Sequence, residues 1–320
     1  MNPDGFLADV LEEPATLRRV LEATDHPNAP VAELAARIEA ARLVVLIGMG
    51  SSRFAALTAA AHLRARGIPA VVEYASTDLP AQPAPGVLAI GISATGNSAE
   101  TVHALERHRG ISQTVAITNG GQLGALADLA VPLDAGTEAG GVACKTFQAT
   151  LAVLLRAAGV DASALAPAAD AQEALLQARD QWLDPLLDLL DGAHTIYAIA
   201  PASRISSALQ SALMFREGPR LPADATETGD WSHVDVYLTK HPNYTALMFG
   251  GSPYDAEALT WIEERRARIV AVGRPIAGAA LHIPYPRADD PLVATLTDVT
   301  VAELTAATWW RRRLHAGTMP

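Results

Sequence analysis

The chain has 320 residues, half of them hydrophobic, and a formal net charge of −11 at pH 7. That length provides enough apolar residues for two domain cores, and the negative charge argues against a nucleic-acid surface, which needs basic patches. The single cysteine, Cys144, excludes a disulfide framework and a cysteine-based metal site. The N-terminus has no basic segment followed by an apolar run, and no stretch approaches the ~20 apolar residues of a membrane span. We therefore expect a cytoplasmic protein that binds neither nucleic acid nor membrane.

The first strong strand pattern is the apolar run 43–47. It follows an expected helix over 31–42 and leads through the turn Gly48-Met49-Gly50-Ser51-Ser52 into an alanine-rich helix. This turn suggests a dinucleotide site, and Glu73 lies near the ~20-residue offset of a ribose-binding acid. Arg53, however, stands where that motif needs a third glycine. A solvated strand end is the alternative for Glu73.

The second strand pattern, 87–92, runs directly into a loop rich in hydroxyl groups. Ser93, Thr95 and Ser98 surround Gly96, whose lack of a side chain lets the backbone approach a ligand closely. The residues that follow open a helix, and its free N–H groups and positive dipole end favour an anion. This loop predicts a cradle for the phosphate of a phosphorylated small molecule.

The rest of the chain alternates short apolar strands with helical stretches, which indicates parallel sheets. Expected strands cover 114–119, 195–200, 244–249 and 269–272, and expected helices cover 144–158 and 203–216. Ser203 and Arg204 repeat the strand-to-helix turn without a hydroxyl-rich loop, so we interpret that turn as structural. The predicted fold class is α/β, with two tandem doubly wound parallel-sheet units. The expected divisions are a helical lead-in over 1–30, a phosphate-binding domain over 31–160, a linker helix over 161–191 and a catalytic domain over 192–320.

The motifs of the first unit resemble those of the sugar isomerase (SIS) domain family. They are the Gly-x-Gly-Ser-Ser turn, the loop Ser-x-Thr-Gly-x-Ser-x-Glu-Thr that ends at Thr101, and further on Gly136-Thr137-Glu138 and Lys145. The best-known family members are the isomerase half of glutamine:fructose-6-phosphate amidotransferase and related sugar-phosphate deaminases and deglycases. The resemblance runs almost end to end and implies two flavodoxin-like SIS units.

By this resemblance, a sugar or aminosugar phosphate is the ligand, and Glu138 lines its pocket, although a helix-capping carboxylate is the alternative for Glu138. The residues that this implies for substrate and phosphate binding are Gly50, Ser51, Ser52, Ser93, Ala94, Thr95, Gly96, Ser98, Thr101 and Glu138.

Catalysis is implied by a second spacing that matches the family. Glu217 follows the expected helix 203–216, and His233 comes sixteen residues later within Glu227–His233. By resemblance, Glu217 is the base that moves a proton between C1 and C2 of an open-chain sugar. His233 opens the ring and reaches in from the neighbouring subunit of a homodimer, with the active site at the interface. No metal and no organic cofactor is implied. The chemistry itself requires such a group, since an aldose–ketose shift needs a carboxylate or imidazole beside the carbon acid.

Departures from the family keep three functions open. Ala94 replaces a glutamine of the amidotransferase loop, the only lysines are Lys145 and Lys240, and no tail lysine follows the last helix, which ends in Trp309-Trp310 and three arginines. With no N-terminal glutaminase domain, we also expect no amide transfer from glutamine. The alternatives are isomerisation or deamination of a hexose 6-phosphate, deglycation of a bulkier amine conjugate, and a non-catalytic sugar-phosphate sensor. Glu217 and His233 together favour an enzyme, whereas Ala94 and the missing lysine favour a sensor.

Overall fold

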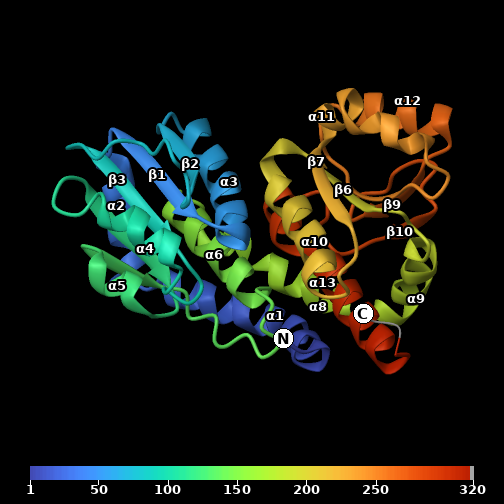
Figure 1. Cartoon of the computed structure of the whole chain (residues 1–320), viewed down its shortest axis with the longest axis horizontal. Helices are drawn as coiled ribbons and strands as arrows, with labels where there is room; N and C mark the ends of the chain where they lie inside the picture. Colours follow the sequence, from blue (N-terminus) through green and yellow to red (C-terminus); the bar gives the residue numbers. More distant parts are fainter. Residues whose placement is uncertain (318–320) are drawn as a thin grey trace. The chain divides into compact units, whose positions relative to one another are not determined.

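The computed structural model of the protein describes residues 1–317, so the last three residues of the expected domain 192–320 lie outside the described part. Its contacts divide the chain into two compact units that are interleaved in sequence (Figure 1). The first-sheet unit comprises Ala15–Thr137 and Ala143–Ala166, and the second-sheet unit comprises Met1–Pro14, Glu138–Val142 and the chain from Pro167. Helix α1 (Pro3–Asp25) begins in the second-sheet unit and continues into the first-sheet unit.

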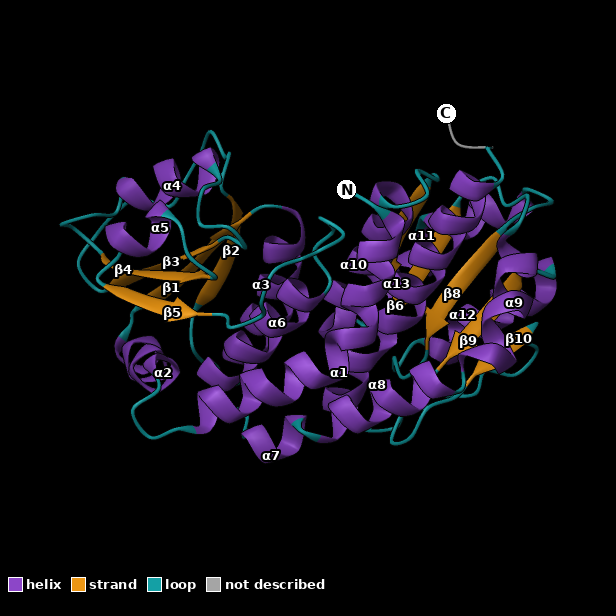
Figure 2. Ribbon diagram, turned by 90° about the horizontal axis from the view of Figure 1, so that it is seen from below, coloured by secondary structure: helices purple, strands orange, loops and turns teal. Residues whose placement is uncertain are grey.

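The first-sheet unit contains five parallel strands in the order β2-β1-β3-β4-β5. The strands are β1 (Leu43–Gly48), β2 (Ala70–Tyr74), β3 (Val87–Ile92), β4 (Gln113–Thr118) and β5 (Leu129–Pro132). The helices are α2 (Pro30–Ala40), α3 (Gly50–Ala65), α4 (Ala99–Glu106), α5 (Gln122–Leu126), α6 (Lys145–Ala157) and α7 (Ala162–Leu165). Helices α4 and α5 cover one face and α2 lies on the other (Figure 2). Because both faces are covered, every residue of β3 is buried, which explains its unbroken apolar run.

The second-sheet unit contains five further parallel strands in the order β10-β9-β8-β6-β7. The strands are β6 (Ile196–Ala200), β7 (Ala223–Glu227), β8 (Thr245–Phe249), β9 (Arg268–Val272) and β10 (Leu281–Ile283). The helices are α8 (Pro167–Gln177), α9 (Arg179–Leu190), α10 (Ile205–Glu217), α11 (Thr228–His233), α12 (Asp255–Arg265) and α13 (Pro291–His315), with short 3-10 turns η1 (Ala202–Arg204) and η2 (Asp235–Lys240). Helix α10 packs on α13, and α11 packs on α12 (Figure 1). Numbered within its own unit, each sheet has the strand order 2-1-3-4-5.

The prediction of an α/β fold with parallel sheets is confirmed, and the expected strands lie within about one residue of the observed ones. Strands β5, β7 and β10 are absent from the expectations. All three lie at sheet edges, β5 and β10 have only four and three residues, and the only apolar residues of β7 are two alanines. The segment 161–191 is helical nearly throughout, and Gln172 Nε2 of α8 donates to the Leu296 carbonyl of α13 at 2.7 Å. None of the helices in residues 1–317 is long and apolar enough to cross a bilayer.

Two glutamates meet inside the second-sheet unit. Glu13 and Glu303 are both fully buried, and Thr300 Oγ1 donates to Glu13 Oε2 at 3.1 Å. Burial is the main cause that raises the pKa of Glu13 well above its ordinary value, and the charge of Glu303 and its hydrogen bond act in the same direction. A protonated Glu13 can donate to Glu303, so this pair is more stable with a shared proton than with two charges.

The shared proton predicts a dependence of stability on pH. A carboxyl group whose pKa is raised by folding stabilises the fold fully below its unfolded pKa, and this contribution is lost as the pH rises through the folded value. We therefore expect urea unfolding midpoints to fall as the pH rises above the ordinary carboxyl range, and to fall less in Glu13→Gln, whose amide cannot ionise. Exposed Glu264→Gln is the control. An equal fall in Glu13→Gln and the wild type would contradict a titrating Glu13.

Candidate functional site

The carboxyl ends of β1 and β3 form the topological switch point of the first sheet. These strands are neighbours in register, with Ile47 beside Gly91, while the chain leaves them toward opposite edges of the sheet. Open α/β sheets bind ligands in the crevice at such a point. The structure therefore brings together the two loops that the sequence singled out, Gly48–Ser52 after β1 and Ser93–Ser98 after β3.

The Ser93–Ser98 loop is fixed by backbone hydrogen bonds to the β4–α5 turn. Ser93 is buried, its N–H donates to the Ile117 carbonyl at 3.1 Å, and its hydroxyl accepts from the Gly96 N–H at 3.1 Å. The Leu123 N–H donates to the Gly96 carbonyl at 3.0 Å. Gly96 has φ +68°, and a Cβ placed there would lie 1.8 Å from the Gly120 carbonyl oxygen. The loop is therefore held in one conformation, which requires glycine at this position.

The other hydroxyls of this loop lie at the N-terminus of α4. Ser98 is the N-cap residue, but its hydroxyl donates to Glu100 Oε2 at 3.0 Å and accepts from Thr101 Oγ1 at 3.2 Å. Thr95 Oγ1 accepts from the Asn97 N–H at 3.3 Å. A hydrogen bond with its own backbone and one from the Ser98 hydroxyl lower the pKa of Glu100, and the helix N-terminus favours the same negative charge. A phosphate bound here would compete with Glu100 for the Ser98 hydroxyl, and Ala94 contributes no polar side-chain group.

The turn after β1 contributes an exposed glycine at positive φ and two partly buried serines. Gly50 has φ +48° and is exposed, with no atom within 4 Å of the place where a Cβ would stand. Ser51 and Ser52 follow it in the first turn of α3. Glu73 Oε1 accepts from the Ala81 N–H at 2.7 Å, and the Arg53 guanidinium lies 4.0 Å from the Tyr74 ring centroid. Since the strand order is not the 3-2-1-4-5 of dinucleotide folds, these contacts favour a structural Glu73 over a ribose-binding one.

Glu217 is the last residue of α10 and belongs to the second-sheet unit. Its side chain is half-buried, and this burial raises its pKa, while Arg216 opposes the rise. Its position at the negative end of a helix disfavours the charged form further. The next residue, Gly218, donates its N–H to the Met214 carbonyl at 3.0 Å, and a Cβ placed there would lie 3.6 Å from the rings of Phe6 and Trp310. Glu217 is thus a carboxyl group on a rigid element whose pKa has moved toward neutrality, as a general base requires.

His233 ends α11, in the same unit, and its side chain is exposed. The helix is capped by Glu227, whose carboxylate accepts from the N–H groups of Gly229 at 2.8 Å and Asp230 at 3.0 Å. Trp231 anchors it, since this fully buried ring donates from Nε1 to the Tyr244 hydroxyl at 2.9 Å. The histidine therefore projects from a well-anchored helix into solvent.

Glu138 lies on the 138–142 loop, which the second-sheet unit holds against the N-terminal segment. Asn2 Nδ2 donates to the Ala139 carbonyl at 3.1 Å, and the Gly140 N–H donates to Asp9 Oδ2 at 2.7 Å. Glu138 itself is partly exposed, and its charge contributes to the raised pKa of Glu13. Glu138, which the resemblance places in the sugar pocket, therefore interacts electrostatically with the buried Glu13. The sequence alone did not indicate this group of acidic side chains.

The equivalent switch point of the second sheet is filled by the protein itself. Arg204, at the end of η1, is buried and donates from Nη1 to Asp298 Oδ2 at 2.5 Å and from Nη2 to the Phe249 carbonyl at 3.2 Å. The Tyr285 hydroxyl donates to the other oxygen of Asp298. The pKa of Asp298 is raised, mainly by burial, and the charge of Arg204 opposes this rise. These contacts agree with the interpretation of the turn at Ser203 and Arg204 as structural. The sequence analysis did not identify Asp298 as the partner of Arg204, although an aspartate inside the apolar run of α13 indicated a buried charge.

Comparisons with known proteins give the first-sheet unit a family match. Residues 37–158 match the model of the SIS domain. The chain is 29% identical over 286 residues to a glutamine–fructose-6-phosphate aminotransferase [isomerizing] of Pyrobaculum aerophilum, which covers 83% of this chain and 46% of that protein. The chain thus spans about half the length of the curated relatives it matches.

Solved structures share the fold. Tagatose-6-phosphate ketose/aldose isomerase from Escherichia coli superposes with a TM-score of 0.81 at 19% identity, over 98% of this chain and 93% of that one. Glucosamine-6-phosphate deaminase from Thermotoga maritima superposes with a TM-score of 0.71 at 18% identity, over 97% and 95% of the two chains. The expected SIS resemblance is therefore confirmed for residues 37–158, and the fold is that of phosphosugar isomerases.

Proposed function

We propose, from the SIS-domain match of residues 37–158, that this chain binds a hexose 6-phosphate or aminohexose 6-phosphate and transfers a proton between its C1 and C2. The observation that carries the proposal is the Ser93–Ser98 loop: buried and exposed hydroxyls, a required glycine and a helix N-terminus at the switch point of an open sheet. The names of the relatives, which are phosphosugar isomerases, a deaminase and an aminotransferase, support the same substrate class.

In this proposal Glu217 is the base. Its carboxylate takes the proton from C2 of the open-chain aldose, the released electron pair forms the C1–C2 double bond, and O1 takes up a proton. The enediol then loses the proton of O2 while Glu217 returns its proton to C1, so the ketose forms with no net gain or loss of protons. The raised pKa of Glu217 supports this role, because a base must also be able to hold the proton between the two steps.

A homodimer is part of the proposal. His233 is exposed, and close to it in sequence lie three exposed apolar side chains, Val234, Tyr237 and Leu238. Such a patch suits a contact with another protein surface. We propose that the contact is a second copy of the chain, to whose sugar His233 is supplied for ring opening.

The deciding experiment is proton exchange in heavy water. Glucosamine 6-phosphate, fructose 6-phosphate and glucose 6-phosphate are each incubated with the protein, and their C1 and C2 protons are followed by NMR. Every enediol route requires exchange at these carbons, whatever happens to the nitrogen. Exchange with any of the three supports the proposal and identifies the substrate class. No exchange, together with ligand-dependent stabilisation of the protein, would replace it by the sensor or by a bulkier substrate.

The phosphate cradle has its own test. In the double variant Ser93→Ala/Ser98→Ala we expect the affinity for glucose 6-phosphate to fall by a factor on the order of ten to a hundred, because hydrogen bonds to a charged group are lost. Weak binding of unphosphorylated glucose should not change. Isothermal titration measures both, with Thr260→Ala on the exposed surface of α12 as the control. If the affinities for the phosphorylated and the unphosphorylated sugar fell equally, the loop would not be the phosphate-binding site.

A further inference from the structure

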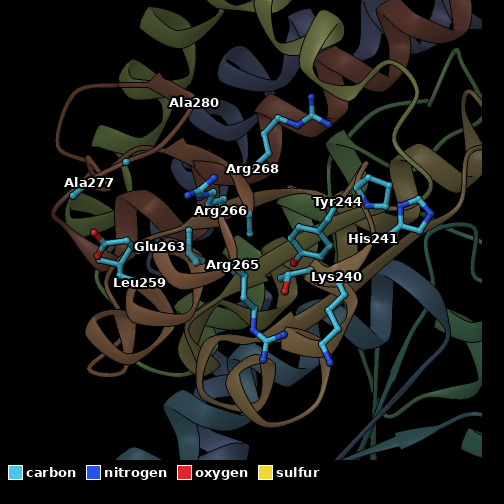
Figure 3. A pocket seen from close by; sticks show the side chains of 15 residues that line it. Lys240, His241, Tyr244, Leu259, Glu263, Arg265, Arg266, Arg268, Ala277 and Ala280 are labelled. Atoms are coloured by element: carbon cyan, nitrogen blue, oxygen red, sulfur yellow. The ribbon is translucent and has the colours of Figure 1, made fainter.

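A pocket lies in the second-sheet unit, at the amino ends of its strands (Figure 3). It has a volume of about 940 Å³ and is lined by residues that precede β8, by the turn from α12 to β9 and by the loop before β10. Its size is within the range of small-molecule sites. Phosphate cradles of open α/β sheets lie at the carboxyl ends of strands, so this pocket is a different kind of site from the Ser93–Ser98 loop.

The lining is strongly basic in a chain that is acidic overall. Lys240, Arg265, Arg266 and Arg268 line the pocket with a single carboxylate, Glu263. The net charge of these side chains is +3, against −11 for the whole chain. None of the four cations forms an ion pair within residues 1–317. Positive charge is therefore concentrated where the fold does not neutralise it.

Two of the cations are held against the same aromatic ring. Lys240 Nζ lies 5.9 Å and Arg265 Cζ 5.7 Å from the centroid of Tyr237, and Arg265 also lies 5.1 Å from the centroid of Trp261. These rings position the guanidinium without neutralising it. Arg265 Nε is buried and has no hydrogen-bond partner within the described residues. Arg265 therefore keeps hydrogen-bonding capacity that the fold does not use.

Arg266 occupies a backbone position that favours a different residue. It follows the last residue of α12 with φ +52° and ψ 38°, the left-handed conformation in which helices commonly end on glycine. Its N–H donates to the Glu263 carbonyl at 3.1 Å, a bond that glycine would make equally well. The backbone therefore does not require arginine, and the feature specific to this residue is an exposed guanidinium on the pocket wall.

We propose that this pocket binds a metabolite that carries a diphosphate or triphosphate group on an apolar or ring-shaped body. Three arginines and a lysine match several negative charges, and guanidinium groups bind phosphate oxygens in a bidentate manner. The apolar part of the ligand lies on the floor formed by Tyr244, Leu259 and Ile262. A long polyanion such as a nucleic acid fits less well, because the site is concave and the rest of the acidic chain repels it.

The test measures binding of inorganic pyrophosphate and of ATP by isothermal titration at low ionic strength. In Arg266→Gly and in Arg268→Gln we expect affinity for both probes to fall at least about tenfold, since each change removes a charged contact. Arg266→Gly should unfold at no lower temperature than the wild type, because glycine suits this conformation. Arg287→Gly is the matched control: it also removes an arginine at positive φ, +59°, but outside the pocket. Its affinity should equal that of the wild type.

Three results would overturn the proposal. One is wild-type affinity for pyrophosphate and ATP in both pocket variants. Another is loss of their binding in Ser93→Ala/Ser98→Ala with full binding in the pocket variants, which would assign the anions to the first-sheet loop. The third is no binding of either probe to the wild-type protein. Because the sugar-phosphate proposal is tested by proton exchange, either proposal can fail without the other.

Discussion

Glu217→Gln is expected to slow proton exchange at C1 and C2 of the substrate sugar by a factor of about 10² to 10⁴, the usual contribution of a general base. Glutamine has the same shape but cannot accept the proton, so the affinity for the sugar phosphate should stay within a few-fold of the wild type. Exchange is measured by NMR in heavy water and affinity by titration. Glu264→Gln, an exposed glutamate near the end of α12, is the matched control and should exchange at the wild-type rate.

A loss of stability would not explain that result. Burial raises the pKa of Glu217, so its charged form is the less favoured one in the folded protein, and the neutral amide removes this cost. We therefore expect Glu217→Gln to be at least as stable as the wild type at neutral pH. In the wild type, exchange should rise with pH as Glu217 loses its proton, through a pKa above the ordinary carboxyl value. Undiminished exchange in the variant would exclude Glu217 as the base.

Gly96→Ala is expected to be the most damaging small substitution in the first-sheet unit. The new methyl group would lie 1.8 Å from the Gly120 carbonyl oxygen and 2.8 Å from Thr118 Oγ1, and the residue would have to keep φ +68°. Backbone atoms cannot rotate away as a side chain can, so the β4–α5 turn must move. Positive φ costs an alanine about 1 kcal/mol or more, and overpacking adds about 1–3 kcal/mol. Both sugar-phosphate affinity and the free energy of unfolding should fall.

Gly67→Ala separates the two causes. Gly67 has φ +80° but no atom within 4 Å of its Cβ position, so its substitution has only the conformational cost, about 1 kcal/mol. Urea unfolding of both variants gives the difference, which measures the clash at Gly96. If Gly96→Ala lost no more stability than Gly67→Ala, the close packing of the loop on the β4–α5 turn would not be required for the fold.

The sequence predicted the parts of the fold that local patterns determine. The run Val87–Ile92 is buried on both faces, so its hydrophobicity is continuous and its strand is easily identified, and the loop that follows has turn chemistry of its own. Strand β7 was not predicted, because Ala223–Glu227 includes only two apolar residues, both alanines. It lies at the sheet edge and pairs with β6 alone. Its place depends on the neighbouring strand, which a local pattern does not contain.

Contacts between distant residues account for what the sequence did not show of the sites. Arg204 and Asp298 are 94 positions apart, and although the apolar run around Asp298 indicates burial, no local pattern identifies Arg204 as its partner. The basic pocket combines three segments that meet only after β8, β9 and β10 pair. The roles of Glu217 and His233 followed from a family resemblance in their spacing and stay predictions, whereas the raised pKa of Glu217 required the burial that the structure provides.

The interleaved order of the second-sheet unit affects its synthesis. Glu13 accepts a hydrogen bond from Thr300, which is made 287 positions later. At about 5–20 residues per second on the ribosome, its partner follows roughly 15 to 60 seconds behind. During this interval the unit lacks α13, and the glutamate is hydrated and ionised. The first-sheet unit ends at Ala166, so all of its residues are made well before α13. Completion of the second unit then places Glu13 in the buried surroundings that raise its pKa, and slow translation of α13 would prolong the exposure of its apolar face.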